Sequence, residues 1–466
     1  MGRPMETKAL NINSISGLPK PEEVLLKQLV GIYNSHLGAN KKKRKYYEGH
    51  ILLRDVNLDI ALPDGFSGLE IGCEWGAKCV DVLASRSMFD GYVSKAGGKA
   101  SEMNDILERN GLCDQYMKAV RDELQFGSTF ATLSADPDKK CRIRFHSPMT
   151  ASAIWDGERG QIAAGLAIVD VGLDEAKKSY SPKAVNLYTD TAIWELHRDG
   201  QKWTAKRHEH DMGRPLMEPM VWNATSIKPF GRSRLKEPIR RLIDCYVRTI
   251  ANATIGLEFS TTPQKYLLGL TDEQFDTVVN QKFKQYIGSI VASTVNPETG
   301  EKPTFGQLQQ GTIEPHVQMM RLLATQFSAA TGLTVTDVGV VNDANPTSSD
   351  AILAQSQTLV CLAEQLNASN AQSLITIARM AQAIASAKTL DQLTEEELDV
   401  IPHFKNPAMP SVAATADAAV KIASARPEFA GTDTFLEMIG FSQADIRRIK
   451  AQEQRERGLQ VLGELE

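Results

Sequence analysis

The sequence predicts an α+β protein, because helical periodicity and strand alternation occupy separate stretches of the chain. Between residues 129 and 208, six short runs are rich in β-branched and aromatic side chains, as strands usually are. Two long amphipathic runs follow, the first opening near Gly231 and the second at Glu314. With 466 residues and 42% hydrophobic content, the chain is long enough for several domains with cores of their own.

The composition argues against several classes of protein. Lys and Arg number 52 against 57 Asp and Glu, and this net charge of -5 disfavours a general nucleic-acid binder. The six cysteines form no C-x-x-C pair, so we expect reduced thiols and no zinc knuckle. No apolar run reaches the roughly 18 residues of a membrane span, and no signal peptide is recognisable. We therefore expect a protein made and used in solution.

The N-terminal part is predicted to begin as a loose segment and to continue as a helix. Residues 1–20 are polar and contain prolines, so we expect them to be flexible. Residues 22–37 carry an apolar helical pattern, and the run Lys41-Lys42-Lys43-Arg44-Lys45-Tyr46-Tyr47 follows. This run either contacts nucleic acid or forms a solvated helix end anchored by its tyrosines, and we favour the second interpretation.

A helix and then a sheet are predicted for the middle of the chain. The amphipathic pattern from Ser101 to Phe126 favours one helix. The strand pattern occupies Thr129–Leu133, Cys141–Phe145, Ala163–Val171, Ala184–Tyr188, Ala192–His197 and Lys202–His208. Asp199-Gly200 is suited to a hairpin turn between the last two strands.

The sequence contains no complete catalytic or metal-binding motif. In His208-Glu209-His210-Asp211 the two histidines share one face of a strand, so they could hold a metal if a third ligand came from elsewhere. We favour a polar strand end. Gly97-Gly98-Lys99-Ala100 lacks the hydroxyl that a P-loop uses to bind magnesium. Because nucleophile-elbow and dinucleotide motifs are also missing, we expect neither enzymatic activity nor a cofactor.

The first amphipathic run is predicted to form one long helix that packs nearly parallel to a second. Pro238 is tolerated only in a first turn, so the first helix should start near Arg234 or Leu235, with Ser233 close to its cap. The second should open at Glu314, and a third should run from the capping residues before Ala351 to about Ser386. The apolar stripes of the first two helices contain Leu235, Ile239, Leu242, Tyr246, Ile250, Leu257, Met320 and Phe327.

Four short strings occur in a fixed order along the second half of the chain. They are Gly231-x-Ser233-Arg234, Pro263-Gln264-Lys265-Tyr266-Leu267-Leu268-Gly269, Lys302-Pro303-Thr304-Phe305-Gly306-Gln307-Leu308 and Pro346-Thr347-Ser348-Ser349-Asp350-Ala351-Ile352. None is specific alone. Their order and spacing resemble the portal (head-tail connector) proteins of tailed bacteriophages, of the siphophage type.

The resemblance implies a portal-type fold with wing, helical stem, small α/β clip and α-helical crown, which assembles into a ring, commonly of twelve copies. It divides the chain into a flexible N-terminus at 1–20, a wing at 21–230, a first stem helix at 231–261, a clip at 262–310, a second stem helix at 311–332, a tunnel loop at 333–348, a long helix at 349–368 and a crown with tail at 369–466.

The resemblance also implies a function and partners. Double-stranded DNA would be packaged and ejected through a channel at one capsid vertex. The terminase large subunit, a head-tail connector or adaptor protein, and the major capsid and scaffolding proteins would be partners, with no membrane involved. The protein would reside in the virion after assembly in the host bacterial cytoplasm. The alternative is a non-viral helical scaffold or a DNA-binding protein without catalytic activity.

Two sets of residues are candidate assembly or channel sites. Arg234, Arg241 and Arg248 repeat every seven residues and either bridge to carboxylates of the next subunit, which we favour, or contact DNA. The tunnel loop would contribute Val335, Asp337, Val338, Val340, Val341, Asn342, Asp343 and Asn345. Residues 322–378 contain no Lys or Arg, as expected of a channel along which DNA slides, or of a buried stretch without room for long side chains.

Overall fold

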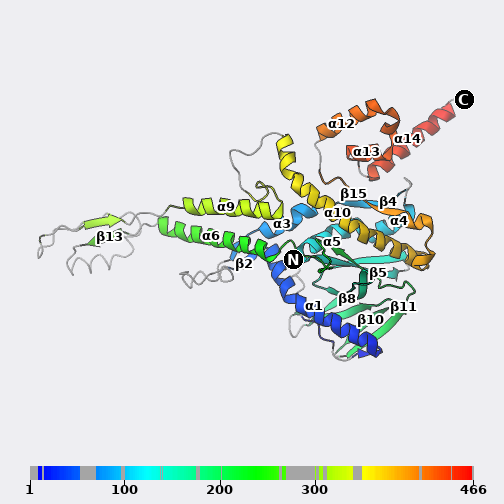
Figure 1. Ribbon diagram of the computed structural model, residues 1–466, viewed down its shortest axis with the longest axis horizontal. Helices are drawn as coiled ribbons and strands as arrows, with labels where there is room; N and C mark the ends of the chain where they lie inside the picture. The colour runs from blue at the N-terminus through cyan, green and yellow to red at the C-terminus, as the bar shows by residue number, and fades with distance from the viewer. Residues whose placement is uncertain are drawn as a thin grey trace. The chain divides into compact units, whose positions relative to one another are not determined.

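The computed structural model describes most of the chain. The described residues are 9–12, 15–52, 70–95, 100–136, 138, 140–174, 179–200, 202–261, 265–268, 300, 304–307, 312–339, 349–408, 412–441 and 443–463. The chain folds into two compact units. The large unit consists of Met1–Gly49, Glu74–Arg240 and Ser328–Glu466, and the small unit consists of His50–Cys73 and Arg241–Phe327. Both helices and strands are abundant, which confirms the α+β class (Figure 1).

The large unit is built on a six-stranded sheet with the order β1-β11-β10-β9-β8-β7. Its strands are β1 (Ile15–Ser16), β7 (Ala151–Asp156), β8 (Gln161–Asp174), β9 (Ser179–Tyr188), β10 (Ala192–Asp199) and β11 (Lys202–Glu209). Helix α1 (Lys20–Tyr47) lies across one face and buries Leu26, Leu29 and Tyr33 in the core that it shares with the sheet (Figure 1). The predicted hairpin is confirmed, since Asp199 pairs with Lys202 around Gly200, which has a φ of 59°.

A second, three-stranded sheet with the order β12-β5-β6 lies in the same unit. Its strands are β5 (Ser128–Asp136), β6 (Lys140–His146) and β12 (Met217–Val221). The same unit contains α3 (Trp75–Ala84), β4 (Phe89–Ser94), α4 (Ser101–Asn110) and α5 (Leu112–Phe126). The single helix predicted for residues 101–126 is wrong. Gly111 has a φ of 60°, a left-handed conformation that suits glycine and ends α4 before α5 begins.

The N-terminal segment corrects the prediction that residues 1–20 are flexible. Leu10 and Ile12 are buried in the core beneath α1, and the Asn34 side chain bonds both the amide and the carbonyl of Leu10, at 2.8 and 2.9 Å. Strand β1 then pairs with β11. The described residues from 9 onward are therefore an integral edge of the large unit.

The C-terminal part corrects the boundary expected between residues 368 and 369. Helix α10 (Ser349–Ala385) continues through it, and the hydroxyls of Ser369 and Ser373 donate to carbonyls of β12 at 3.1 and 2.7 Å. Strand β15 (Val400–Phe404) then pairs with β4. The remaining elements are η2 (Leu390–Gln392), α11 (Glu395–Leu398), α12 (Val412–Ala425), η3 (Pro427–Gly431), α13 (Asp433–Ile439) and α14 (Gln443–Gly463). A separate crown therefore cannot begin at residue 369.

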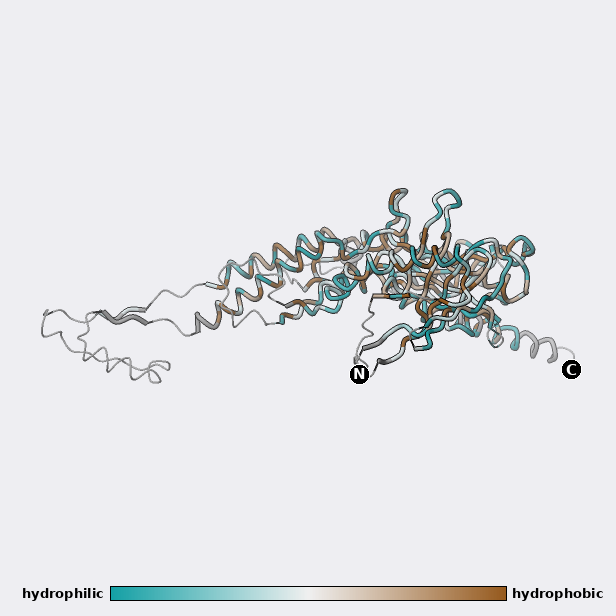
Figure 2. The backbone as a smooth tube through the Cα atoms, turned by 90° about the horizontal axis from the view of Figure 1, so that it is seen from below, coloured by the Kyte–Doolittle hydropathy of each residue, from teal (hydrophilic) through white to brown (hydrophobic). Residues whose placement is uncertain are grey.

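The small unit is dominated by two long helices that run side by side in both views (Figures 1 and 2). Its elements are β2 (His50–Leu52), β3 (Glu70–Gly72), most of α6 (Glu237–Thr261), β13 (Lys265–Leu268), β14 (Thr304–Gln307) and most of α9 (Glu314–Thr331). Strands β13 and β14 pair antiparallel. In the part of the chain that the structure describes, no helix is both long and apolar enough to cross a membrane.

Candidate functional site

Helix α6 carries two neighbouring apolar rows, of which only one is buried within the chain. Ile243, Val247 and Ala251, spaced by four, are fully buried. The predicted row of Leu242, Tyr246 and Ile250 lies beside it and is half-buried, while Leu235 and Ile239 at the start are buried and Leu257 at the end is 43% exposed. The folding of one chain therefore leaves the predicted row partly open.

Helix α9 shows the same division into a buried and an open face. Leu323 and Phe327 are buried, and Met320 is half-buried. Met319 and Leu322 are 41% and 52% exposed. Apolar side chains held open on a regular helix are available to pack against another surface.

Arg234 does not belong to a basic stripe, so that prediction is wrong. Helix α6 begins at Glu237, and Arg234 lies in the non-helical segment before it, so the seven-residue spacing has no meaning there. Its side chain is only 9% exposed and donates to the carbonyl of Cys79 at 2.7 Å and to that of Thr331 at 2.6 Å. The guanidinium also lies over the ring of Trp222, 5.9 Å from its centre. Arg234 is thus an internal clamp and is closed to DNA or a neighbouring subunit.

Arg241 and Arg248 keep the positions predicted for them on α6. Arg241 is exposed and Arg248 is half-buried. Because seven residues are nearly two turns, both lie on one side of the helix. They stay candidates for contacts beyond the subunit.

Gly231 makes possible the tight passage from β12 into α6, a role that the sequence pattern did not reveal. Its φ is 66°, and a Cβ atom there would lie 2.2 Å from the carbonyl oxygen of Trp222. The next amide, of Arg232, donates to that same carbonyl at 3.0 Å. The Gly231-x-Ser233-Arg234 string was the available signal, and its glycine and arginine both prove to be structural.

The predicted tunnel loop is described only as far as Gly339. Val335 is half-buried, and the Asp337 carboxylate accepts bonds from the amide and the hydroxyl of Thr334 at 2.9 and 2.8 Å. Val338 is buried, so the prediction that it lines a channel is corrected. Val340, Val341, Asn342, Asp343 and Asn345 lie outside the described residues.

The basic run at the end of α1 is mostly engaged in contacts within the chain. Lys43 donates to the Phe126 carbonyl at 2.8 Å, and burial, reinforced by Arg240, lowers its pKa to about 8. Tyr46 is buried beneath Arg240. The Tyr47 hydroxyl donates to Asp81 at 3.0 Å, and burial with that carboxylate raises the pKa of Tyr47 to about 12. These contacts support the interpretation of an anchored helix end.

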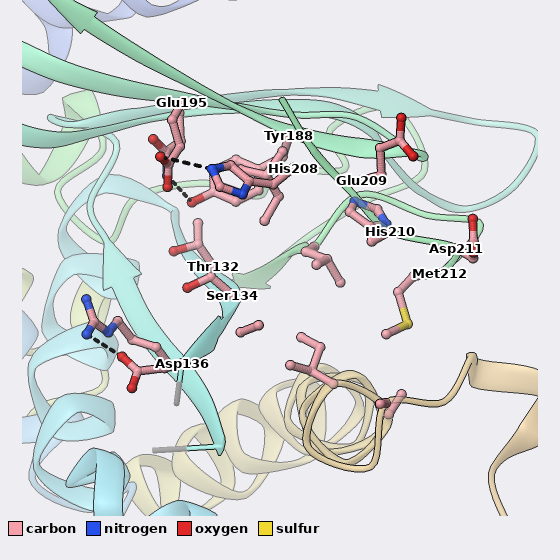
Figure 3. Close-up of a pocket in the computed structure, with 18 of the residues that line it drawn as sticks. Thr132, Ser134, Asp136, Tyr188, Glu195, His208, Glu209, His210, Asp211 and Met212 are labelled. Atoms are coloured by element: carbon pink, nitrogen blue, oxygen red, sulfur yellow. Dashed lines mark hydrogen bonds and ion pairs between the residues drawn. The ribbon is translucent and has the colours of Figure 1, made fainter. Parts of the chain in front are cut away.

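The histidine cluster lines a cavity of about 830 Å³ between the two sheets and the end of α10 (Figure 3). His208 pairs with Glu195 at 3.1 Å, whereas His210 lies apart from that pair, and burial lowers the pKa of its imidazole. No group of three potential metal ligands is found among the described residues. Residues 206–209 at the end of β11 are exposed, as in a polar strand end.

The chain matches the family described as "Phage portal protein, SPP1 Gp6-like" over residues 26–458. The portal protein of Mycobacterium phage D29 is 23% identical over 409 residues, which span 84% of this chain and 79% of that protein. Two solved structures are similar to the chain, each with 12% identity and a TM-score of 0.44. The first is the virion of a native gene transfer agent particle, where the match covers 76% of this chain and 86% of the matched chain. The second is the neck of the native particle computed with C12 symmetry, where the match covers 79% of this chain and 89% of the matched chain. Because the family match at residues 26–458 spans far more than half of this chain, the chain belongs to the phage portal proteins of the SPP1 Gp6-like family.

Proposed function

We propose that copies of this portal protein assemble through α6 and α9 into a ring of twelve subunits, whose channel passes double-stranded DNA at one vertex of a phage capsid. The observation that carries the proposal is the apolar surface left open on both helices, at Leu257, Met319 and Leu322. In a ring, each subunit would cover this surface with a different face of its neighbour, a head-to-tail contact that closes on itself. Family membership supports the same assembly.

Aspartate at Leu322 is expected to prevent ring formation while leaving the fold intact. The side chain is 52% exposed, so one chain folds without burying it, but a ring would bury an unpaired charge at a cost of several kcal/mol. Val24→Asp is the control, because Val24 of α1 is 55% exposed and lies outside the proposed interface. Sedimentation should give rings for the control and small species for Leu322→Asp. Normal rings from Leu322→Asp would remove α9 from the interface.

Arg241 and Arg248 are proposed to bridge to carboxylates of the next subunit. Their position on one side of α6 supports this role. Glutamine at both positions should then weaken rings, increasingly at low salt, where ion pairs are least screened. Intact rings that package DNA poorly would assign the two arginines to DNA instead.

Residues 333–348 are proposed to form the tunnel loop, with Asp337 and Asp343 supplying the acidic charge of a collar around the DNA. The lack of Lys and Arg in residues 322–378 supports a surface that does not hold phosphates. Asp343→Lys should leave rings intact and slow packaging, more strongly at low salt. Unchanged packaging rates would reject this acidic collar.

The partners and location follow from the family resemblance. The clip at 262–310 would receive the terminase large subunit and then a head-tail connector, and the wing would contact the major capsid and scaffolding proteins. The assembled ring would be part of the virion. No catalytic step belongs to this role, so nucleotides and divalent metals should not shift the melting temperature.

A further inference from the structure

A buried chain of polar side chains joins α5 to α10 inside the large unit. Glu123 and Asn370 are both 0% exposed. The Asn370 amide nitrogen donates to Glu123 Oε2 at 2.8 Å and to the Tyr116 hydroxyl at 3.2 Å. Among the described residues no cation pairs with Glu123. An ionised carboxylate in this position would be costly.

The protons of the chain can be assigned one by one. The Ser87 hydroxyl donates to Asn367 Oδ1 at 2.6 Å, so the Tyr116 hydroxyl must donate to Ser87 across their 2.8 Å contact. Both protons of the Asn370 amide are used by Tyr116 and Glu123. Two acceptors are left over, Glu123 Oε1 and Asn370 Oδ1, which are shielded from solvent and have no partner in the described part of the protein.

We propose that Glu123 is a neutral carboxylic acid in the folded protein and that its Oε1–H donates to Asn370 Oδ1. The result is a closed pair of hydrogen bonds between an acid and an amide, which we call the α5–α10 latch. One added proton satisfies both remaining acceptors. Deprotonation would replace this bond by two repelling oxygens and loosen α10 from α5. The latch does not depend on the proposed function.

The electrostatic surroundings agree with a protonated acid. Burial raises the pKa of Glu123 to about 8, against a smaller opposing effect of the Asn370 bond. Apart from Tyr116, which belongs to the same chain of hydrogen bonds, several ionisable groups on α5 and on the elements packed against it interact with groups other than Glu123. Three of these groups donate hydrogen bonds to backbone carbonyls: Tyr92 of β4 to Leu374, Lys43 of α1 to Phe126, and Arg234 to both Cys79 and Thr331. Two cations of α5 form ion pairs, Arg121 with Asp81 and Lys118 with Asp114. The carboxylate of Asp122 interacts with Arg44.

The latch gives the folding equilibrium a defined pH dependence. Because the folded state keeps a proton that an ordinary glutamic acid, with a pKa of 4.5, has lost, unfolding releases that proton between about pH 4.5 and 8. The contribution of Glu123 to stability is therefore greatest below that interval. The folding equilibrium constant falls about tenfold per pH unit across it and levels off above the folded pKa.

The test compares urea unfolding of the wild-type chain and of Glu123→Gln from pH 5.5 to 9. Glutamine keeps the shape and cannot ionise, so the variant should gain about tenfold in folding constant per pH unit relative to wild type until about pH 8. Burial also raises the pKa of Asp122 to about 7. The titration of Asp122 contributes equally to the wild type and the variant, so it cancels in the difference between their stability curves. Glu102→Gln, at an exposed glutamate of α4, should run parallel to wild type.

Parallel curves for wild type and Glu123→Gln would overturn the latch. If the glutamine variant does not fold, Glu123→Met removes the same titration and gives the same difference. Infrared spectra supply a second measurement, in which a carbonyl band of a protonated carboxylic acid should be present in the wild type at pH 6.5 and weaker in either variant. Bands of equal strength would also reject the proposal.

Discussion

Alanine at Gly231 is expected to destabilise the protein by about 3 kcal/mol, the sum of a left-handed backbone and a steric clash. A methyl group at this position would meet the Trp222 carbonyl oxygen at 2.2 Å, and the Val221 side chain and the Gly127 carbonyl at 2.6 and 2.9 Å. Two of these neighbours are backbone oxygens, of Trp222 directly after β12 and of Gly127 between α5 and β5, so neither can move without shifting the main chain. The free energy of unfolding from urea titration measures the loss.

Gly213→Ala is a matched control for this change. Gly213 has the same φ of 66°, but no atom lies within 4 Å of a Cβ built there. Gly213→Ala should therefore lower the free energy of unfolding by only about 1 kcal/mol, which is the contribution of the left-handed backbone alone. Equal losses for the two variants would show that the close approach at Gly231 has no energetic weight.

Methionine at Arg234 should cost about 3 kcal/mol, because it removes two charge-assisted hydrogen bonds that are shielded from water. The bonds tie the carbonyl of Cys79 in α3 to that of Thr331 at the end of α9. Methionine keeps much of the volume of the side chain, so the loss reports the bonds and the contact with Trp222. Thermal and urea unfolding should both record it.

Arg232 provides the comparison for Arg234, since it lies in the same segment with an exposed side chain. Arg232→Met should change the free energy of unfolding by less than about 0.5 kcal/mol. A similarly small change at Arg234 would contradict its role as an internal clamp and restore it as a candidate for contacts between subunits.

The strands between residues 129 and 208 could be predicted because a sheet with one buried face leaves alternation in the sequence. Which row of α6 is buried could not be predicted. The row that contains Leu242 and the row that contains Ile243 are both apolar, and only the packing of the folded chain distinguishes them. Arg234 misled for a related reason, because Pro238 limits where a helix starts without fixing its first residue.

Other features were hidden by composition. The N-terminal segment looked loose because it is polar, although its apolar residues Leu10 and Ile12 are buried in the folded protein. Single charged residues in amphipathic helices usually face solvent, so the local sequence does not distinguish Glu123 from an exposed glutamate. The burial of Glu123 depends on Asn370, which lies far away in the sequence, and no local pattern could reveal that pairing.

Closure of this portal protein into a ring around an open channel is the step on which the proposed function depends. Electron microscopy of the purified full chain in negative stain tests it most directly, with rotational averaging of end-on views to count subunits. We expect closed rings of twelve copies with a central hole, which the Leu322→Asp variant does not form. Dispersed monomers, or particles without a hole under conditions where the chain is folded, would contradict it.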